Sequence, residues 1–345
     1  MPSSKFKLFT IKLLNWEYWP FSVVYFPVFF YFAWLALRAR SIFFFTASNP
    51  SIDFGGMFGE KKSEIFDILP QEYIPQTKLI QKGDVDDALK KSEKIGFPLI
   101  AKPDIGERGT WVSKVKNQDE LKTYAEKCPT DFLLQELIDY PIELGVFFVK
   151  RPGEKGRVTS IVRKEFLMVK GDGKKSVLEL IKEKPRALLT ANLESELLSE
   201  RKNDILEVGE KLLIEPIGNH CRGTKFLNDT PKIDAELNDA FVKLAELIPD
   251  FYFGRFDLKC ESYEDLKLLR NFKILELNGA GAEPGHIYEP GYSLIKAYKV
   301  IFWHLKVLKE ISVYNHKNGV PYWPLKDGIK KWKDHNAHNK RLEAR

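Results

Sequence analysis

Two segments late in the chain alternate apolar and polar side chains, and this alternation most restricts how the chain can fold. Neighbouring side chains of a β-strand point to opposite faces of its sheet. In the segment 251–260, one face is expected to carry Phe253, Arg255 and Asp257. In the segment 272–278, one face is expected to carry Ile274, Glu276 and Asn278, and the other Leu275 and Leu277. Because the two segments are close in sequence, we expect them to pair and to bring their polar side chains together.

This pairing would place two carboxylates and one amide oxygen side by side. Asp257, Glu276 and Asn278 offer hard oxygen donors of the kind that Mg²⁺ or Mn²⁺ binds, with positions left open for phosphate oxygens. Arg255 would lie beside them. The same pattern is also typical of an exposed sheet face with an ordinary salt bridge, which contributes little to stability. The alternation alone therefore leaves two interpretations, a metal site and a salt-bridged surface.

The rest of the chain mixes short strands and amphipathic helices without a regular strand–helix repeat. Strands are expected at 97–103, 111–115, 132–136, 143–150 and 158–166. The last two are joined by a Pro- and Gly-containing turn, which predicts a hairpin. Helices are expected at 83–95, 117–125, 176–181, 186–213, 233–247 and 294–311. This order predicts an α+β fold with antiparallel sheets.

The positive charge of the chain is concentrated at its two ends. The net charge is +6, and residues 1–40 carry five basic residues against one acid, while residues 317–345 carry eight against three. The slightly acidic body argues against a nucleic-acid groove, and the basic ends favour an anionic membrane surface. For the C-terminal tail, a frayed and solvated segment is the alternative. The three widely spaced cysteines imply no disulfide framework and favour the cytosol.

A run of 20 uncharged residues, Tyr18–Leu37, lies near the N-terminus. As a helix rising about 1.5 Å per residue, it would just cross a hydrocarbon core of about 30 Å. Trp16, Trp19 and Trp34 resemble an interfacial aromatic belt, whereas Pro27 interrupts the middle of the run. The run indicates membrane contact, spanning or re-entrant, with a buried helix or hairpin of a soluble subdomain as the alternative. We expect a cytoplasmic protein, attached to the cytoplasmic membrane through residues 18–37 if this run meets lipid.

An ordered series of motifs precedes the two alternating strands. The series consists of Lys102 at the end of an apolar strand, a glycine-bearing loop at 104–110, the run Gln135, Glu136, Leu137 and Ile138, and then Glu143. In this order, the motifs resemble those of the ATP-grasp superfamily over about residues 77–310. The resemblance implies an ATP-grasp fold, in which two α+β subdomains with antiparallel sheets clasp ATP.

The resemblance also implies a role for each matching residue. Lys102 looks like the lysine that meets the α- and β-phosphates, and the loop 104–110 like the loop that covers them with backbone N–H groups. The residues that resemble the adenine-reading hinge are Gln135, Glu136, Leu137 and Ile138. Glu143 is similar to the acid that binds ribose hydroxyls. The residues that match the metal ligands and the arginine near the transferred phosphoryl group are Asp257, Glu276, Asn278 and Arg255. Further candidates for phosphate contact are Arg163, Lys164, Arg222 and Lys225.

With these motifs the chain divides into five expected parts. Residues 1–48 form the apolar N-terminal segment, and residues 49–76 a linker or small subdomain. The lid subdomain then covers residues 77–150, and the metal and substrate subdomain residues 151–311. Residues 312–345 form the basic tail.

Two branches of the superfamily are similar to parts of the chain. The segment from Arg163 to Ile181 is similar to the cyanophycin-synthetase branch, and the whole is similar to D-alanine–D-alanine ligases. The loop 279–288 departs from both, so a D-alanine acceptor does not follow from the resemblance. In that loop, Glu283 and His286 are candidates to recognise or deprotonate an amine; an ordinary loop with a hydrogen-bonded histidine is the alternative.

The function that the resemblance implies is an ATP- and Mg²⁺-dependent ligase that joins a small-molecule carboxylate to an amine or thiol through an acyl phosphate. Two other functions fit the same motifs. One is a non-catalytic ATP-binding module at the membrane, and the other is a phosphotransferase of the same fold. Neither the substrates nor the oligomeric state follows from the sequence.

Overall fold

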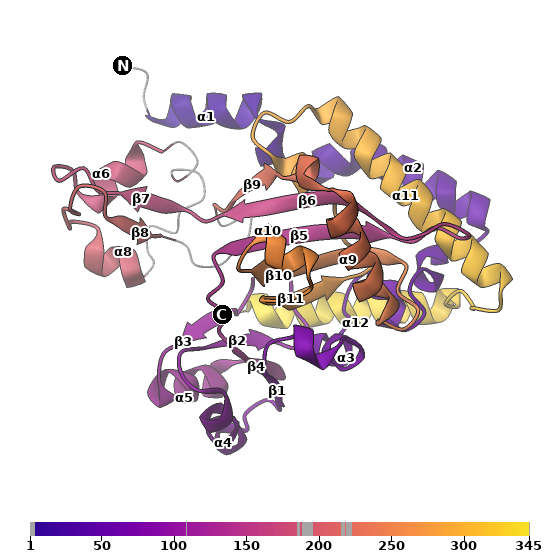
Figure 1. Ribbon diagram of the computed structural model, residues 1–345, viewed down its shortest axis with the longest axis horizontal. Coiled ribbons are helices and arrows are strands. Elements are labelled where there is room, and N and C mark those ends of the chain that lie inside the picture. Colours follow the sequence, from indigo (N-terminus) through magenta and orange to yellow (C-terminus); the bar gives the residue numbers. More distant parts are fainter. Residues whose placement is uncertain are drawn as a thin grey trace.

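The computed structural model describes residues 4–107, 109–184, 187, 196–214, 218 and 223–344. The strands in these ranges form a five-stranded, a four-stranded and a two-stranded sheet, and every pair of neighbouring strands is antiparallel. Figure 1 shows the five-stranded sheet in the centre, with the four-stranded sheet below it. The expected α+β class with antiparallel sheets is confirmed.

The five-stranded sheet has the order β11-β10-β5-β6-β9. Its strands are β5 (Ile142–Val149), β6 (Arg157–Glu165), β9 (Lys225–Asn228), β10 (Phe253–Cys260) and β11 (Phe272–Asn278). The expected β5–β6 hairpin and the pairing of β10 with β11 are both confirmed. Between them, β10 pairs with β5, so the two alternating strands continue the hairpin into one sheet.

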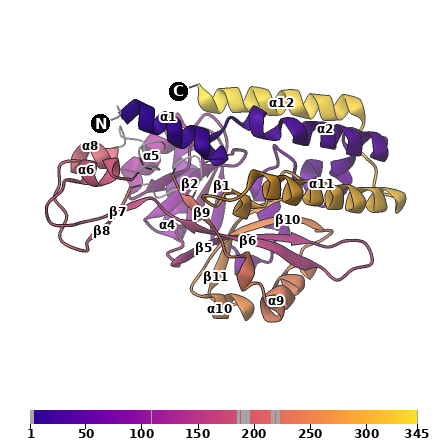
Figure 2. The ribbon, with the colours of Figure 1, turned by 90° about the horizontal axis from the view of Figure 1, so that it is seen from above.

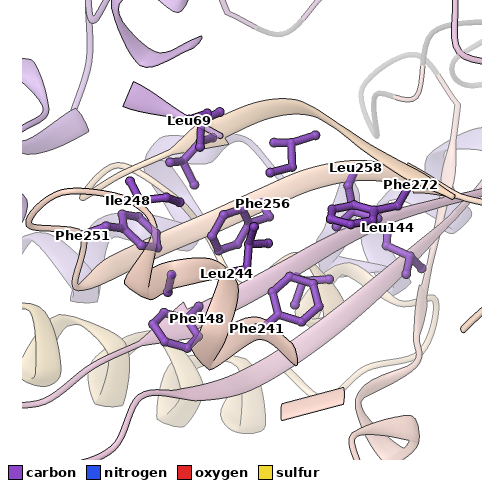
Figure 3. Close-up of a cluster of buried hydrophobic side chains, with 14 of the residues drawn as sticks. Leu69, Leu144, Phe148, Phe241, Leu244, Ile248, Phe251, Phe256, Leu258 and Phe272 are labelled. Atoms are coloured by element: carbon purple, nitrogen blue, oxygen red, sulfur yellow. The ribbon is translucent and has the colours of Figure 1, made fainter. Parts of the chain in front are cut away.

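One face of this sheet is buried under α9 (Ala235–Glu246) and α10 (Tyr263–Lys267). Figure 3 shows the apolar side chains that fill the space, with Phe148, Phe241 and Phe256 at the centre. Removing a side chain of this size from water stabilises the folded state by roughly 1.5–3 kcal/mol. The helix α9 forms because its apolar residues recur at helical spacing, and Asp234 accepts a hydrogen bond from Leu237 N at its start.

The four-stranded sheet has the order β1-β4-β2-β3 and carries two helices on one face. Its elements are β1 (Thr77–Ile80), α4 (Val85–Ile95), β2 (Leu99–Pro103), β3 (Ser113–Val115), α5 (Gln118–Lys127) and β4 (Phe132–Glu136). The helix expected from residue 117 is confirmed, and the Asn117 side chain caps it by accepting a hydrogen bond from Glu120 N. The strand expected from residue 111 begins only at Ser113, because Trp111 adopts a positive φ of 59°.

A smaller unit extends from the edge of the five-stranded sheet (Figure 1). It contains β7 (Met168–Lys170), α6 (Val177–Lys182), α8 (Glu196–Arg201) and β8 (Lys211–Leu213). The helix expected over 176–181 is confirmed as α6, which begins with a capping box formed by Ser176 and Glu179. The continuous helix expected over 186–213 is wrong in its last part, because residues 211–213 pair with β7 as strand β8.

The N-terminal apolar run folds onto the body of the protein. It follows α1 (Ser4–Leu14) and the 3₁₀ turn η1 (Trp16–Tyr18), and forms α2 (Phe21–Ala39), with Pro27 inside the helix. Along its whole length α2 packs against α11 (Leu294–Lys317), through Val24 and Val28 near one end and Leu35 near the other. In Figure 2, α2 and α11 lie on one side of the five-stranded sheet, and α9 and α10 on the other.

The short elements between α2 and the four-stranded sheet are η2 (Phe44–Ala47), η3 (Asp53–Gly56), α3 (Lys62–Ile68) and η4 (Gln71–Tyr73). Two more 3₁₀ turns, η6 (Thr230–Lys232) and η7 (Gly285–Tyr288), adjoin the five-stranded sheet. The segment expected as a basic tail contains a helix, α12 (Leu325–Glu343), which also lies on the α2 side (Figure 2). Its Lys331 pairs with Asp53, so α12 is held against the turn η3.

Candidate active site

The pairing of β10 with β11 brings the predicted polar side chains together. In the register of the two strands, Asp257 lies opposite Glu276, and Arg255 lies opposite Asn278. Residues opposite one another in an antiparallel pair project from the same face of the sheet. This face is the one turned away from the phenylalanine core of Figure 3. The convergence predicted from the alternation is therefore present.

The alternation itself breaks once inside β11. The register shifts after Asp257, so that Leu258 lies opposite Ile274 and Leu275 is the extra residue of a β-bulge. Ile274 consequently belongs to the buried core, while Leu275 borders the polar face. The prediction that Ile274 shares a face with Glu276, and that Leu275 points away, is wrong. A bulge depends on the partner strand, and a single-strand pattern does not record it.

Asp257 is the centre of a buried network of charges. Arg255 donates to both of its carboxylate oxygens, from Nε at 2.6 Å and from Nη2 at 3.0 Å. Lys164 Nζ lies 3.5 Å from Asp257 Oδ2 and donates to Glu143 Oε1 at 2.9 Å. Although burial alone would raise the pKa of the Asp257 carboxyl, Arg255 and Lys164 lower it below the ordinary value. The network therefore holds Asp257 as a carboxylate.

The two cations of this network are also held in their charged forms. Burial alone would lower the pKa of Lys164, but the carboxylates of Asp257 and Glu143 raise it above the ordinary value. Burial likewise disfavours the charged form of Arg255, and Asp257 again reverses the effect. The result is a largely buried surface with fixed charges of both signs.

Glu276 and Asn278 are less engaged than Asp257. Glu276 Oε1 lies 3.6 Å from Lys62 Nζ, and about one third of the Glu276 side chain is exposed. The side-chain nitrogen of Asn278 is buried and has no hydrogen-bond partner among the described residues. An unpaired buried amide is costly unless a ligand or water satisfies it.

The donor set of these residues fits a hard divalent cation. Two carboxylates with free lone pairs and the amide oxygen of Asn278 match the oxygen preference of Mg²⁺. The described residues contain no group of three or more His, Cys, Asp or Glu side chains arranged to hold a metal. A cation held by Asp257, Glu276 and Asn278 would therefore need further oxygens from a substrate, which is the usual situation for Mg²⁺.

Lys102 approaches the same site from the four-stranded sheet. Its Nζ donates hydrogen bonds to Gln135 Oε1 at 2.9 Å and to the carbonyl oxygen of Leu275 at 3.1 Å. Burial lowers the pKa of Lys102 to about 8, since removing an ammonium from water disfavours its charged form. The carbonyl oxygen that Lys102 contacts in β11 thus belongs to the bulge residue, Leu275.

The remaining predicted residues lie where the chain passes from one sheet to the other. Gln135 also donates to Thr77 Oγ1 at 3.0 Å, and Glu136 accepts from Gln76 N at 3.1 Å. Both side chains are thus held by residues at the start of strand β1: Thr77 is its first residue, and Gln76 directly precedes it. Strand β1 itself pairs with β4. The carbonyl of Ile138 accepts from Lys259 Nζ at 3.0 Å. These contacts leave Leu137 and Ile138 bordering the space between the sheets.

All ten residues assigned from the sequence border one cleft of about 860 Å³ between the two sheets. They are Arg255, Lys102, Gln135, Glu136, Leu137, Ile138, Glu143, Asp257, Glu276 and Asn278. A cleft of this size is within the range of small-molecule and cofactor sites, about 300–1,000 Å³. The lysine and the arginine can bind a ligand that carries several negative charges. The two carboxylates can bind a cation that accompanies such a ligand.

The glycine-bearing loop, of which residues 104–107, 109 and 110 are described, closes one side of the cleft. Asp104 anchors it by accepting hydrogen bonds from the backbone N and the hydroxyl of Ser63, at 2.8 and 2.9 Å. From outside, α12 covers it, since His338 Nε2 lies 3.0 Å from the carbonyl of Ile105 and Leu342 packs near Gly106. The basic C-terminal segment thus contacts the site.

Other candidates from the sequence are placed differently. Lys164 is in the cleft, but its neighbour Arg163 lies on the opposite face of β6 and pairs with Asp229 at 2.9 Å. Lys225 is partly exposed and lies 4.0 Å from Glu165. His286 is buried outside the cleft, whereas Glu283 borders it. Arg222 lies outside the described residues.

The side chains in the cleft that sequence reasoning missed include Lys62, Glu60 and Tyr25. Lys62 lies next to Glu276 and donates to the carbonyl of Gly106 at 2.6 Å. Glu60 borders the same space, where burial raises the pKa of its carboxyl, and its Oε2 has no hydrogen-bond partner among the described residues. Tyr25, from α2, is the third. No local pattern marks these three, although Glu60 and Lys62 directly follow a glycine-rich turn.

Comparison with known proteins gives structural similarities only. No protein-family model and no curated protein sequence matches the chain. The solved structures that are similar include a bifunctional glutathione synthetase from Pasteurella multocida, at 14% identity and a TM-score of 0.37, covering 70% of this chain and 35% of that one. They also include the VanG D-Ala:D-Ser ligase from Enterococcus faecalis, at 15% identity and 0.43, covering 76% and 64%. A D-alanine–D-alanine ligase from Bacillus anthracis, at 16% identity and 0.43, covers 78% and 72%.

This chain spans about a third of the length of the glutathione synthetase and just under two thirds of the D-Ala:D-Ser ligase. At such identities and TM-scores, the functional argument has to come from the residues of the cleft.

Proposed function

We propose that this protein is an ATP-dependent ligase that joins a carboxylate to an amine, with Mg²⁺ as cofactor. The observation that supports the proposal is the shared cleft. In it, the facing pairs Asp257–Glu276 and Arg255–Asn278 lie across from Lys102, with the residues of the expected nucleotide hinge between the two sheets. Metal ligands, phosphate-binding cations and a nucleotide edge are the parts that phosphoryl transfer needs.

The reaction that we propose has two steps. An oxygen of the substrate carboxylate attacks the γ-phosphorus of ATP, the bond from that phosphorus to the β-γ bridging oxygen breaks, and ADP leaves with the electron pair. The amine, once its ammonium form has lost a proton to solvent, attacks the acyl carbon of the acyl phosphate through its nitrogen, the C–O bond breaks, phosphate leaves, and the second proton of the nitrogen passes to the departing phosphate. Positioning and charge neutralisation are the tasks of the protein in both steps.

Each group in the cleft has a task in this proposal. Lys102 contacts the α- and β-phosphates, and Arg255 stabilises the charge on the transferred phosphoryl group. Lys62, beside Glu276, is a further cation at the phosphate end. Asp257, Glu276 and Asn278 would hold Mg²⁺, which neutralises phosphate charge when bound. The hinge 135–138 contacts adenine, and Glu143 contacts the ribose.

The test is the stable product formed by the purified protein with Mg-ATP and a panel of carboxylates, amino acids and other amines. A ligase releases free phosphate and ADP only when both a carboxylate and an amine are present. A phosphorylated acceptor as the final product would instead indicate a phosphotransferase. Binding of ATP without phosphate release under every mixture would overturn the proposal in favour of a non-catalytic module.

The lowered pKa of Lys102 gives a prediction for the pH dependence of ATP use. Its pKa of about 8 means that the free protein loses this charge as the pH rises above 8. We expect kcat/KM for ATP to fall above about pH 8, because this parameter reports ionisations of the free protein. Lys102→Arg is the control, since arginine stays charged throughout. Whatever the absolute activity of this variant, its kcat/KM for ATP should not fall above about pH 8. The same pH profile in both proteins would contradict the role of Lys102.

The same pKa has a consequence for stability. The unfolded chain keeps the Lys102 proton up to the ordinary value near 10.4, whereas the folded protein releases it near 8. Between these pH values the unfolded chain binds more protons, so the contribution of Lys102 to the free energy of unfolding rises with pH. At neutral pH the buried ammonium costs roughly 3 kcal/mol, which a bound triphosphate would offset.

We propose further that the protein is attached to the cytoplasmic membrane with α2 in the plane of the membrane surface. By length and composition, α2 is the one helix in the described residues that is apolar enough to cross a bilayer. Its outer face exposes Phe21, Val23, Phe26, Phe29, Phe30, Trp34 and Leu37. Its inner face packs on α11, which exposes Lys296, Lys299 and Lys306. Crossing would draw this lysine-bearing helix into hydrocarbon, so an in-plane position is favoured.

Liposome flotation tests this attachment. Replacing Phe26 and Phe30, whose rings contact each other, by serine should release most of the protein from vesicles that contain phosphatidylglycerol. Leu268→Ser is the matched control, because Leu268 is equally exposed but lies beside α10 on the opposite side of the sheet. Equal losses in both variants would contradict the in-plane position, as would the absence of binding by the unchanged protein.

A further inference from the structure

The cleft contains a second polar group apart from the proposed metal ligands. Glu283 accepts a hydrogen bond from Tyr25 at one carboxylate oxygen, and from Tyr288 at the other at 2.9 Å. The two hydroxyl groups lie 3.3 Å apart. Both tyrosines and Glu283 border the cleft. A carboxylate is thus held in place by two phenols, one from α2 and one from η7.

This carboxylate is close to the reacting end of the proposed site. Arg255 Nη1 donates to the backbone carbonyl of Glu283 at 3.0 Å, while the same guanidinium holds Asp257. Among the ion pairs formed by described residues, none includes Glu283. Hydroxyl donors can orient a carboxylate but do not neutralise it. The Glu283 carboxyl group thus borders the cleft near the arginine without a salt bridge to any described residue.

Aromatic rings pack against the two tyrosines that hold Glu283. The ring of Trp16 lies 5.6 Å from that of Tyr288, and Phe21 stacks on Tyr25 at 4.2 Å. Trp16, Trp19 and Phe21 also border the cleft. A carboxyl group and aromatic rings that line the same end of a cleft suit an ammonium group, through both charge and cation–π attraction.

The apolar border of this end continues outside the cleft. Phe21 is half exposed, and it is followed on the outer face of α2 by the exposed side chains of Phe29 and Phe30. The ring of Phe29 also contacts that of Phe21. A ligand whose ammonium group reaches Glu283 could therefore lay an apolar chain over Phe21 without leaving contact with the protein.

We propose that this end of the cleft is the acceptor site, and that it takes a primary ammonium group carried on an apolar chain. The inference rests on the proposed ligase function, for which it names the class of amine. The helix α2 then serves the reaction directly, because it supplies Tyr25 and Phe21 to the site. The amphiphilic acceptor would be presented from the same side as the exposed face of α2.

A simpler explanation is that the two tyrosines and Glu283 only fasten α2 to the loop. Glu283→Gln separates the two cases. The amide oxygen still accepts a tyrosine hydrogen bond and the shape is kept, but the charge is removed. A purely structural contact would lose little, whereas an ammonium site would lose its main attraction.

The experiment is a calorimetric titration of the full chain with ethylamine, n-butylamine and n-octylamine, and with 1-octanol as the uncharged comparison. In the unchanged protein, affinity should rise roughly two- to fourfold per added methylene, and octylamine should bind at least about tenfold tighter than octanol. Glu283→Gln should abolish the preference for the amine over octanol. Phe21→Ser should flatten the dependence on chain length but keep the preference for the amine.

Glu289→Gln is the matched control, because Glu289 lies in the same loop outside the cleft, where it accepts from Asn228 N. It should titrate like the unchanged protein. An unchanged amine preference in Glu283→Gln would overturn the inference, and so would equal binding of octylamine and octanol by the unchanged protein. These titrations contain no ATP, so failure of the acceptor site is read separately from failure of phosphate release.

Discussion

Replacing Glu276 by glutamine is expected to lower ATP turnover by at least about 10²–10³-fold while the protein stays folded. The glutamine side chain has the same size but no charge, so it neither binds a divalent cation strongly nor balances Lys62. The structural cost is small, because Glu276 is partly exposed and its pairing with Lys62 at 3.6 Å is of the weak, solvated kind. Phosphate release at saturating Mg-ATP measures the effect on turnover.

The control is Glu165→Gln. Glu165 ends strand β6 of the same sheet and also lies near a lysine, Lys225 at 4.0 Å, but it is outside the cleft. Both variants should unfold within a few degrees of the unchanged protein, and only Glu276→Gln should lose turnover. Titration with Mg²⁺ adds a second measurement, because Glu276→Asp should recover part of the activity at raised Mg²⁺. Turnover of Glu276→Gln close to that of the unchanged protein would remove Glu276 from the proposed metal site.

Local patterns were sufficient to predict the sheet that carries the site. Alternation along β10 and β11 predicted that Asp257 and Glu276 would converge, because neighbouring strands in sequence usually pair and because side-chain direction has a period of two. The helix starts at Asn117 and Ser176 were equally local, since each depends on a side chain that reaches a backbone N–H three residues ahead. Such features do not need knowledge of distant contacts.

The errors have a different physical origin. The bulge at Leu275 arises from the register between two strands, and its result, Ile274 in the core, cannot be read from β11 alone. Strand β8 forms only because β7 offers it a partner. In both places a contact distant in sequence overrides the local preference.

The cleft residues that sequence reasoning missed also depend on contacts that are distant in sequence. Tyr25 meets Glu283 across 258 positions of the chain, and Lys62 meets Glu276 only because α3 packs beside the cleft. Hydropathy identified the run that contains α2 but not its partner. An apolar helix that packs on the protein with one face and exposes aromatic rings on the other can have the same mean hydropathy as a helix that spans a membrane. The roles of all these residues in binding ATP, metal and substrate stay predictions that only solution experiments test.

Replacing Asp257 by alanine is expected to lower the free energy of unfolding by about 3–5 kcal/mol, in addition to abolishing turnover. The carboxylate is buried between Arg255 and Lys164, so its removal leaves two buried cations close to each other. Lys164 keeps Glu143 as a partner, whereas Arg255 keeps, among its hydrogen bonds to described residues, only the one to the carbonyl of Glu283. Most of the loss should therefore come from the unpaired guanidinium.

A double-mutant cycle separates this cause from a general packing loss. Arg255→Leu removes the cation, and the combination of Asp257→Ala with Arg255→Leu should be less destabilised than the sum of the single variants by about 2 kcal/mol or more. Denaturant unfolding of the four proteins gives the values. Asp239→Ala serves as the reference, because Asp239 pairs with Lys155 at a similar distance on the open surface, and it should cost far less. If Asp257→Ala costs no more than Asp239→Ala, or if the two changes at 255 and 257 simply add, the charges of the cleft do not stabilise one another, and the electrostatic basis of the proposed site is lost.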